Sequence, residues 1–482
     1  MFEQEIPEEA DVVIIGAGVI GCSIARELSR YELKTIVIEK ESDVGWVTTK
    51  GNMGIIHGFV PKMGVLKGKM CIEGNRQFDK IAEELDVPFK RVGLLIVALS
   101  IIQFFALIIA YFLLRKRKIE VKWIWKRKLR EMEPNISEKA KAALFVPSFG
   151  IIDPVQYTIA LAENAIRNGV KIILNTKVIG FKIEENEIKE VITDKGRIKT
   201  RFVINAAGIY SDEIEALIGL KERKMWHGKG VMLVFDKILE GFYKHILAPM
   251  PIRVDPKTKG GAIGLTVHGR PIWGPNLVEA RGKKDTSVLD EDIKMILQKF
   301  RELLREFPDN FIIKYYAGVR PVDEKSWDFV LGPTKVKGFI NAAYILSPGL
   351  TAAPIIAKKI IEYLEKEGLE LRLKENFDPY RKRIKSIREM DIEELDRAIK
   401  ENPKYGRIIC ECEKISEAEI IEAIKRGART IDSIKFRTLA GMGRCQGSRC
   451  LTKIMKILEK ELQINPKEIT VKGEGSNIFV GE

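Results

Sequence analysis

The start of the chain combines a short strand, a glycine-rich turn, a helix and a second strand. An apolar run over residues 11–15 leads into the turn, a helix-like stretch follows it, and a second apolar run over 35–38 ends at Glu39. The turn has the GxGxxG spacing, with Gly16, Gly18 and Gly21. These glycines permit a tight turn, the close approach of a pyrophosphate and close helix–strand packing, while Glu39 is placed to accept a hydrogen bond from a ribose hydroxyl. The pattern predicts an α/β fold that binds a dinucleotide, with a glycine-rich turn of another α/β protein as the alternative.

Later segments extend this prediction. Short strands are expected at 170–174, 188–193 and 202–204, and the small residues of 205–208 would let the backbone approach a nucleotide closely. No second GxGxxG follows a strand, so the sequence predicts one dinucleotide, either FAD or NAD. Residues 230–345 alternate short strands with Gly and Pro turns, which is typical of a mostly antiparallel domain.

The net charge is concentrated in one place. The chain of 482 residues has a formal net charge of +14, and residues 115–130 hold nine Lys or Arg and one Glu, so +8 of it lies there. Such a local excess indicates a local surface, and we expect no nucleic acid partner. The acidic N-terminal segment lacks the apolar core of a signal peptide, so we expect a cytoplasmic protein.

An uncharged segment precedes these basic residues. Residues 94–99 read as a strand, Ser100 is a good N-cap, and the helix expected over 101–114 has too few apolar residues to span a membrane. Trp123 and Trp125 follow among the cations. This order favours either a helix that lies on the anionic inner face of the cell membrane or a helix that is buried or covered by a partner, and both alternatives stay open. A helix that spans the membrane ranks third.

Four of the six cysteines lie late in the chain. Their spacing is Cys-x-Cys, then 32 residues, then Cys-x4-Cys, formed by Cys410, Cys412, Cys445 and Cys450. In a chain with no export signal, clustered cysteines favour metal binding over disulfides. Zinc sites prefer pairs spaced Cys-x2–4-Cys, so the pattern favours a [2Fe–2S] cluster over Zn²⁺ or unliganded thiols. Helices are expected on either side of residue 428, and the glycine-rich segment 441–447 could donate N–H groups to sulfur.

These motifs together resemble known proteins. Residues 10 to about 365 resemble the FAD-dependent glycerol-3-phosphate dehydrogenase and D-amino-acid-oxidase-like superfamily, and residues 405–455 resemble the bacterioferritin-associated-ferredoxin (BFD) type of [2Fe–2S] domain. This order of domains is similar to that of anaerobic glycerol-3-phosphate dehydrogenases. The resemblance implies FAD as the dinucleotide and a Rossmann-like FAD-binding domain with an interleaved, mostly antiparallel α+β substrate domain and a small helical C-terminal domain.

The resemblance also divides the chain. It implies an oxidoreductase over residues 1–365, a helical linker over 366–402, and a BFD-like domain with a tail over 403–482. The FAD-binding parts are expected at about 8–60, 150–215 and 335–365. The substrate-domain parts are expected at about 61–149 and 216–334.

Cofactor-binding residues follow from the matching motifs. The resemblance assigns contacts with FAD to the GxGxxG glycines and Glu39. It assigns further contacts to four segments: the loop before His57, residues 177–178 beside the adenine, the strand end at 205–208, and the loop beside the flavin ring at 347–351. Besides those already named, these residues are Thr49, Lys50, Asn52, Val178, Ala207, Gly208, Gly349, Leu350 and Thr351.

Three residues are candidates for the chemistry. Arg320 matches the family position that grips the anionic group of the substrate, and a planar guanidinium suits phosphate and carboxylate alike. Oxidation of an alcohol needs a base for the hydroxyl proton, for which His57 in the flavin loop ranks first and His268 second. A surface arginine and structural histidines are the alternatives.

The implied activity is the oxidation of sn-glycerol 3-phosphate to dihydroxyacetone phosphate, with electrons leaving through the cluster. The acceptor would be a partner flavoprotein or iron–sulfur subunit, or a quinone. An L-2-hydroxyglutarate or amino-acid dehydrogenase, or a non-catalytic electron-transfer subunit, are the other interpretations.

Overall fold

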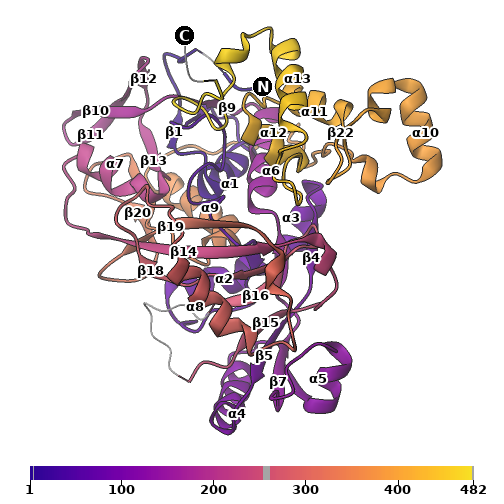
Figure 1. The fold of residues 1–482 in the computed structure, drawn as a ribbon. Coiled ribbons are helices and arrows are strands. Elements are labelled where there is room, and N and C mark those ends of the chain that lie inside the picture. The colour runs from indigo at the N-terminus through magenta and orange to yellow at the C-terminus, as the bar shows by residue number, and fades with distance from the viewer. Residues whose placement is uncertain (4, 253–260, 480–482) are drawn as a thin grey trace.

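A six-stranded sheet forms the centre of the larger domain. The computed structural model describes residues 1–3, 5–252 and 261–479, and this sheet has the order β20–β21–β13–β1–β2–β9, parallel except for β20 (Figure 1). Its strands are short and apolar, as expected for a sheet covered on both faces. They are β1 (Val12–Ile15), β2 (Thr35–Ile38), β9 (Lys171–Ile173), β13 (Phe202–Asn205), β20 (Val330–Pro333) and β21 (Phe339–Ala343).

The two faces of this sheet are covered differently. Alternate residues of β1, Val12 and Ile14, point to a helical layer, whereas Val13 and Ile15 point to the opposite layer. The helical layer contains α1 (Val19–Leu28), α6 (Pro154–Arg167) and α9 (Gly349–Lys366). The opposite layer contains α7 (Ser211–Leu217) and a three-stranded sheet of β10 (Val178–Glu184), β11 (Glu187–Thr193) and β12 (Arg197–Lys199). The expected Rossmann-like arrangement is confirmed.

A nine-stranded sheet forms the second domain. Its order is β18–β14–β17–β16–β15–β5–β7–β6, with β19 beside β14, and its pairs are antiparallel except for β5 with β15. α8 (Asp290–Arg301) packs against it. The strands are β5 (Leu94–Ala98), β6 (Lys122–Trp125), β7 (Ala142–Val146), β14 (Met225–Phe235), β15 (Ile246–Pro249), β16 (Ala262–Leu265), β17 (Pro271–Gly274), β18 (Val278–Glu279) and β19 (Ile312–Asp323).

One helix on the rim of this sheet is unusually apolar. α4 (Ile101–Lys116) begins at Ser100, whose hydroxyl accepts from the backbone N–H of Gln103 in a capping box. The expected strand, cap and helix are therefore confirmed. Within the described part of the chain, no helix combines the length and the apolar character that crossing a membrane requires. The short helix α5 (Lys126–Met132) follows β6 on the same rim.

The structure differs from the expected boundary at residue 61. α2 (Leu66–Asn75) and α3 (Phe78–Glu84) belong to the core of the FAD-binding domain, because Met70, Phe78 and Ile81 are buried in the same cluster as α1 and α9, and α2 packs on α9. β3 (Ile55–Ile56), β4 (Phe89–Arg91) and β8 (Gly150–Ile152) form a small separate sheet. The substrate domain therefore begins nearer to β5. β20 likewise joins the central sheet rather than the substrate domain.

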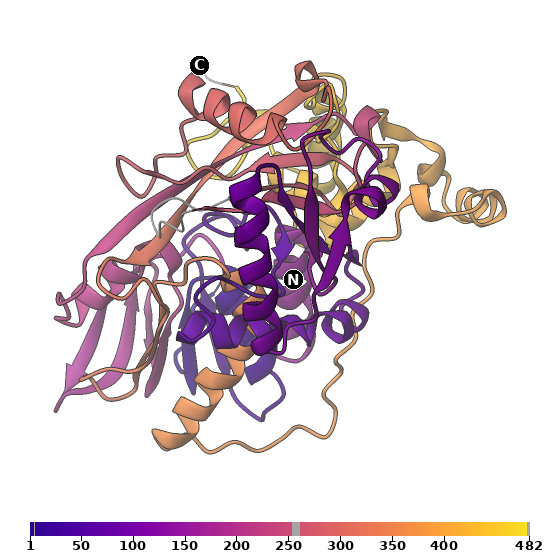
Figure 2. The ribbon, with the colours of Figure 1, turned by 90° about the horizontal axis from the view of Figure 1, so that it is seen from below.

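The predicted helical linker over 366–402 is only partly helical. After α9 the chain follows a long irregular path, visible in Figure 2, before a 3₁₀ turn (Ile387–Glu389) and α10 (Ile392–Glu401). The backbone of Asp378 accepts hydrogen bonds from Asn164 and Asn168, and Arg381 pairs with Glu163 at 2.5 Å. These contacts along α6 replace the internal hydrogen bonds of a helix.

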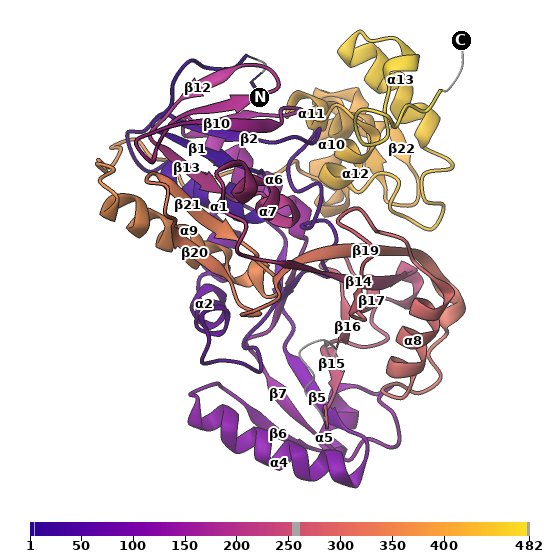
Figure 3. The ribbon, with the colours of Figure 1, turned by 90° about the vertical axis from the view of Figure 1, so that its left-hand side faces the viewer.

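The C-terminal domain is small and has its own core. It comprises the hairpin β22 (Ile408–Cys410) and β23 (Ile415–Ser416), three helices, α11 (Glu417–Lys425), α12 (Ile431–Thr438) and α13 (Leu451–Leu462), and two 3₁₀ turns (Pro403–Gly406 and Pro466–Glu468). The helices expected on either side of residue 428 are thus present. Residues 480–482 of the predicted domain lie outside the described residues. Figure 3 shows the three bodies side by side, with this domain against both others.

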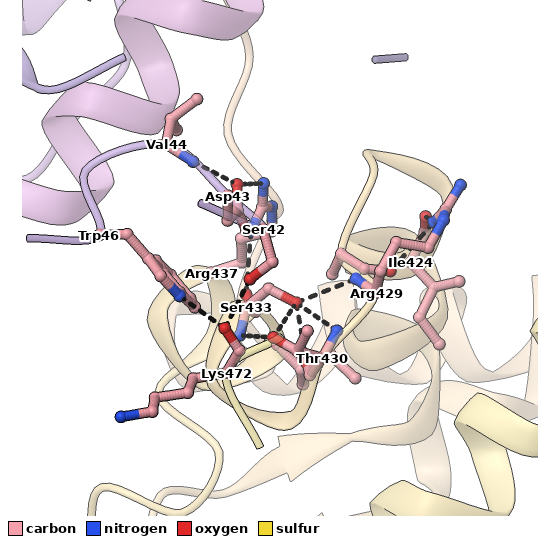
Figure 4. A network of polar contacts seen from close by, with 12 residues as sticks. Ser42, Asp43, Val44, Trp46, Ile424, Arg429, Thr430, Ser433, Arg437 and Lys472 are labelled. Carbon is pink, nitrogen blue, oxygen red and sulfur yellow. Dashed lines mark hydrogen bonds and ion pairs between the residues drawn. The ribbon is translucent and has the colours of Figure 1, made fainter. Parts of the chain in front are cut away.

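A buried ion pair joins the C-terminal domain to the FAD-binding domain (Figure 4). Both terminal nitrogens of Arg437 in α12 bind the carboxylate of Asp43, and the two side chains are 2% and 0% exposed. The backbone oxygen of Lys472 also accepts from Ser42 Oγ at 2.7 Å and from Trp46 Nε1 at 3.0 Å. Burial opposes the charge of Arg437, but Asp43 overcomes this and raises the pKa of the guanidinium. We call this set of contacts the domain clasp.

Removal of one partner from the clasp should destabilise the docked domain. Arg437→Met leaves the Asp43 carboxylate buried and unpaired, which costs about 3–5 kcal/mol. The matched control is Arg407→Met. The Arg407 side chain is largely exposed, so its ion pair with Glu417 contributes at most about 1 kcal/mol to stability. Urea unfolding of both variants measures the difference. Equal midpoints for the two variants would contradict the role of the clasp.

Candidate functional site

A cavity of about 1440 Å³ lies where the central sheet meets the nine-stranded sheet. Its wall includes residues that directly follow β1, β2 and β13, namely Gly16, Glu39 and Ala206. In α/β proteins, ligands bind beyond the carboxyl ends of parallel strands. The volume exceeds the range of about 300–1,000 Å³ that is usual for one drug-sized ligand. The cavity therefore has room for a dinucleotide together with a substrate.

The GxGxxG glycines fit a bound pyrophosphate. Gly16 has a φ of +103°, and a Cβ there would lie 2.6 Å from the carbonyl oxygen of Ala206. A Cβ on Gly21 would lie 1.9 Å from the carbonyl oxygen of Gly16, so Gly21 serves helix–strand packing and stays outside the cavity wall. Gly18 is the N-cap of α1, contributes no side-chain cap, and lines the cavity. The N-terminus of α1 thus faces the cavity with its N–H groups available to phosphate.

Glu39 is held in the wall by two backbone amides. Its Oε2 accepts from the N–H of Ala17 at 2.7 Å and its Oε1 from the N–H of Glu41 at 2.9 Å. Burial raises the pKa of Glu39, although the amides oppose this. Each carboxylate oxygen keeps a lone pair that can accept a ligand hydroxyl. This geometry fits the ribose contact expected from the sequence.

The loop after β2 lies between the cavity and the domain clasp. Thr49 lines the cavity, and its hydroxyl accepts from the N–H of Val19 at 3.1 Å, which fixes the loop on the first turn of α1. Asn52 also lines the cavity. Lys50, predicted to contact the cofactor, lies outside the wall, with its ammonium 4.9 Å from the ring of Trp46. Burial lowers the pKa of Lys50, and the charge of Asp432 in the C-terminal domain opposes this.

Most of the other predicted cofactor residues gather in the same wall. Val178, Ala207, Gly208, Gly349 and Leu350 line the cavity. Thr351 does not, and its hydroxyl instead accepts from the backbone N–H of His57 at 3.0 Å.

Arg320 lies on β19 in the cavity wall. Its Nη1 is buried and has no hydrogen-bond partner among the described residues. Burial lowers the pKa of Arg320 to about 10, so the group remains charged at neutral pH. A Cβ on Gly230 of the neighbouring β14 would lie 2.4 Å from Nη2, so the glycine provides the space for the guanidinium. A buried cation of this kind is stable only when an anion or hydrogen-bond acceptor meets it.

The two candidate histidines lie in different places. His57 lines the cavity, and its backbone is fixed by Thr351 and by Asn75, which donates to its carbonyl oxygen at 3.1 Å. His268 lies outside this cavity, with Nε2 3.5 Å from Asp153 in a separate small pocket. The structure thus does not bring His268 to the site, because the β16–β17 turn carries it toward α6.

The four predicted cluster ligands face one another in two pairs. The thiol of Cys410 interacts with that of Cys450, and the thiol of Cys412 with that of Cys445. The Cys450 thiol and the N–H groups of Gly441 and Glu413 lower the pKa of Cys410 to about 6, although burial opposes this. Across the described residues, no three His, Cys, Asp or Glu side chains converge on a single metal ion. Two thiol pairs suit a cluster of two irons, and the backbone amides suit its charge.

Two ion pairs with the substrate domain, which the sequence did not predict, hold the cysteine segments in place. Glu413, next to Cys412, pairs with the buried Arg270 of the substrate domain. Arg444, next to Cys445, pairs with Asp236 of the same domain. Lys67 and Lys299, which line the cavity and whose pKa burial lowers, were also missed. No local motif marks these residues, since their partners are distant in the sequence.

The chain matches two family models. Residues 11–363 match the model "FAD dependent oxidoreductase", and residues 408–460 match "BFD-like [2Fe-2S] binding domain". The chain is 40% identical to a glycerol 3-phosphate dehydrogenase of Caloramator mitchellensis, over 98% of both chains. It is 31% identical to a glycerol 3-phosphate oxidase of Mycoplasma genitalium, over 77% of this chain and 97% of that protein.

A solved structure has the same fold. The L-alpha-glycerophosphate oxidase of Mycoplasma pneumoniae, determined with FAD bound, superposes with a TM-score of 0.72 at 25% identity, over 78% of this chain and 99% of that one. The expected fold and the two cofactors, FAD and a [2Fe–2S] cluster, are confirmed by these findings.

Loss of one thiol from either pair should remove the cluster. Cys412→Ser or Cys450→Ser replaces a thiolate with a weak ligand, and we expect iron per chain to fall from two to near zero. Iron and acid-labile sulfide measured on purified protein provide the readout. The control is Cys22→Ala, whose thiol is buried beside Ala17, away from the four ligands. Retention of both irons in the Cys412 and Cys450 variants would show that these thiols are not ligands.

Proposed function

The chain belongs to the family of FAD-dependent oxidoreductases and carries a BFD-like [2Fe–2S]-binding domain, and on this basis we propose that it oxidises sn-glycerol 3-phosphate to dihydroxyacetone phosphate. Support comes from the relative that matches it over both domains, a glycerol 3-phosphate dehydrogenase. The oxidase relatives, which match 77% and 78% of this chain, act on the same compound by name.

The observation that carries the proposal is the buried guanidinium of Arg320. It lies in the wall of the cavity with Nη1 unpartnered among the described residues. A phosphate accepts two parallel N–H bonds from such a group and supplies the missing counter-charge. Lys67 and Lys299 add positive charge to the same wall.

His57 is the proposed base. Oxidation of the secondary alcohol removes a hydride from carbon and a proton from the hydroxyl, and an imidazole accepts such a proton near neutral pH. Thr351 of α9 and Asn75 of α2 fix the His57 backbone, and the His57 ring lies edge-on to Phe149 with the ring centroids 5.7 Å apart. FAD, when bound in this cavity, supplies the hydride acceptor.

The C-terminal domain suits an acceptor other than oxygen. The [2Fe–2S] cluster, when bound by the four thiols, supplies a one-electron route out of the protein. Cys412 is exposed and Cys445 is partly exposed, so this pair faces solvent and could approach a partner. We propose a partner flavoprotein or iron–sulfur subunit, or a quinone, as the recipient.

A carboxylate substrate is the main alternative, because Arg320 can bind carboxylate as well as phosphate. L-2-hydroxyglutarate or an amino acid would then replace glycerol 3-phosphate. A non-catalytic electron-transfer subunit would bind both cofactors and turn over none of these compounds.

Substitution of Arg320 tests the proposal. Arg320→Met removes the counter-charge of the phosphate, and we expect kcat/KM for sn-glycerol 3-phosphate to fall at least about thirtyfold, with a smaller loss for Arg320→Lys. Anaerobic assays with an artificial electron-accepting dye measure both variants. The control is Arg281→Met, whose side chain is 78% exposed in the same domain.

Two outcomes would overturn the assignment. A kcat/KM that changes less than twofold in Arg320→Met would exclude Arg320 as the anion site. Faster turnover of L-2-hydroxyglutarate than of sn-glycerol 3-phosphate by the unmodified protein would exclude the substrate.

A further inference from the structure

The outward face of α4 exposes an unusual set of large apolar side chains. Each is between 55% and 65% exposed: Ile101, Ile102, Phe105, Ile109, Phe112 and Leu113. Their positions recur with the helical period, so they form one continuous stripe. Contiguous exposed apolar surface of this kind marks an interaction site.

The opposite side of α4 is occupied by the protein itself. Leu107 and Leu114 are buried against β5 and β7 in a shared core. The helix is therefore firmly packed on one side and open on the other. Figures 1 and 3 show it along the lower edge of the molecule, at the end remote from the C-terminal domain.

Basic residues lie at both ends of the stripe. All nine Lys and Arg residues between positions 115 and 130 are exposed. Arg115 and Lys116 lie in the last turn of α4, and two more cations follow on the turn after it. The other five lie on β6 and α5, near the start of α4. The only acidic residue in this stretch is Glu120.

Aromatic side chains connect the helix to this basic segment. The ring of Phe104 lies 5.7 Å from that of Trp123, which lies 5.4 Å from that of Trp125. Trp125 is itself 63% exposed. Tryptophans beside cations and an apolar stripe are typical of the boundary between lipid headgroups and acyl chains.

We propose that α4, β6 and α5 form a docking surface for an anionic lipid bilayer. The apolar stripe enters the headgroup region with the helix lying flat, and the nine cations meet the lipid phosphates. A helix of sixteen residues packed along one side on its own domain lies on a bilayer rather than through it.

The charges argue against a second copy as the occupant. A twofold contact through this face would bring two sets of nine cations together, which repel each other. The anionic bilayer, in contrast, is complementary to both the charge and the apolar character of the face. Leu113 is exposed on this face and also lines the catalytic cavity, so the docked surface adjoins the cavity wall.

Co-sedimentation of the full chain with lipid vesicles tests the docking surface. We expect the protein to sediment with vesicles of phosphatidylcholine and phosphatidylglycerol, and to sediment less with phosphatidylcholine alone or at high salt. The double variant Phe105→Glu with Ile109→Glu should bind about tenfold more weakly. Lys126→Glu with Arg127→Glu should weaken binding only to the anionic vesicles.

Matched controls separate the surface from general effects of charge. Leu373→Glu with Ile392→Glu changes two side chains that are 69% and 85% exposed outside this face. Lys456→Glu with Lys460→Glu changes two exposed lysines of α13. Both controls should bind as the unmodified protein does.

Three results would overturn the proposal. One is failure of the unmodified protein to sediment with anionic vesicles. Another is unchanged binding by the Phe105 and Ile109 variant. The third is a dimer in light scattering that this variant converts to a monomer, since the face would then join two copies. Vesicle binding does not depend on the substrate, so each result is independent of the proposed activity.

Discussion

The buried ion pair between Arg437 and Asp43 fixes the position of the C-terminal domain on the FAD-binding domain. Two buried opposite charges are stable only in contact, so the C-terminal domain has one favoured position on the FAD-binding domain. Asp43 lies four residues after Glu39 and six before Thr49, both in the cavity wall. The clasp therefore joins the cysteine domain to the loop that borders the cofactor cavity (Figure 4). The pairs Arg270–Glu413 and Asp236–Arg444 attach both cysteine segments to the substrate domain as well.

Charge also organises the interior of the cavity. The glycine turn, the N-terminus of α1 and the carboxylate of Glu39 form the dinucleotide end, where backbone N–H groups face phosphate. Arg320 supplies the other end with a buried positive charge. One wall thus combines groups that fit a dinucleotide with a buried cation, to which we assign the anionic end of the proposed substrate. This separation explains why the cavity lies between two sheets rather than within one domain.

The sequence predicts the turns, caps and helices that depend on local patterns. It does not predict contacts between residues that are far apart in the chain. The GxGxxG turn and the Ser100 cap each act within a few residues, and the structure agrees with the elements expected there. Lys50 and His268 are adjacent to motifs, but Lys50 lies over the ring of Trp46 and His268 lies beside Asp153, both outside the cavity wall. The clasp joins residues 394 positions apart, and no local signal marks such a pair. The prediction of a helical linker over 366–402 is only partly correct for the same reason. Side chains of α6, distant in the sequence, hold part of this segment in an extended path.

We propose that electrons from a phosphate-bearing alcohol reach the cluster in the docked domain. Anaerobic addition of sn-glycerol 3-phosphate to the cofactor-loaded protein tests this, with visible absorbance and electron paramagnetic resonance recorded on the same sample. We expect the flavin absorbance to fall and the signal of a reduced [2Fe–2S] cluster to appear. Flavin absorbance that falls while the cluster stays oxidised would contradict the route through the C-terminal domain. Absorbance that does not change at all would contradict the substrate.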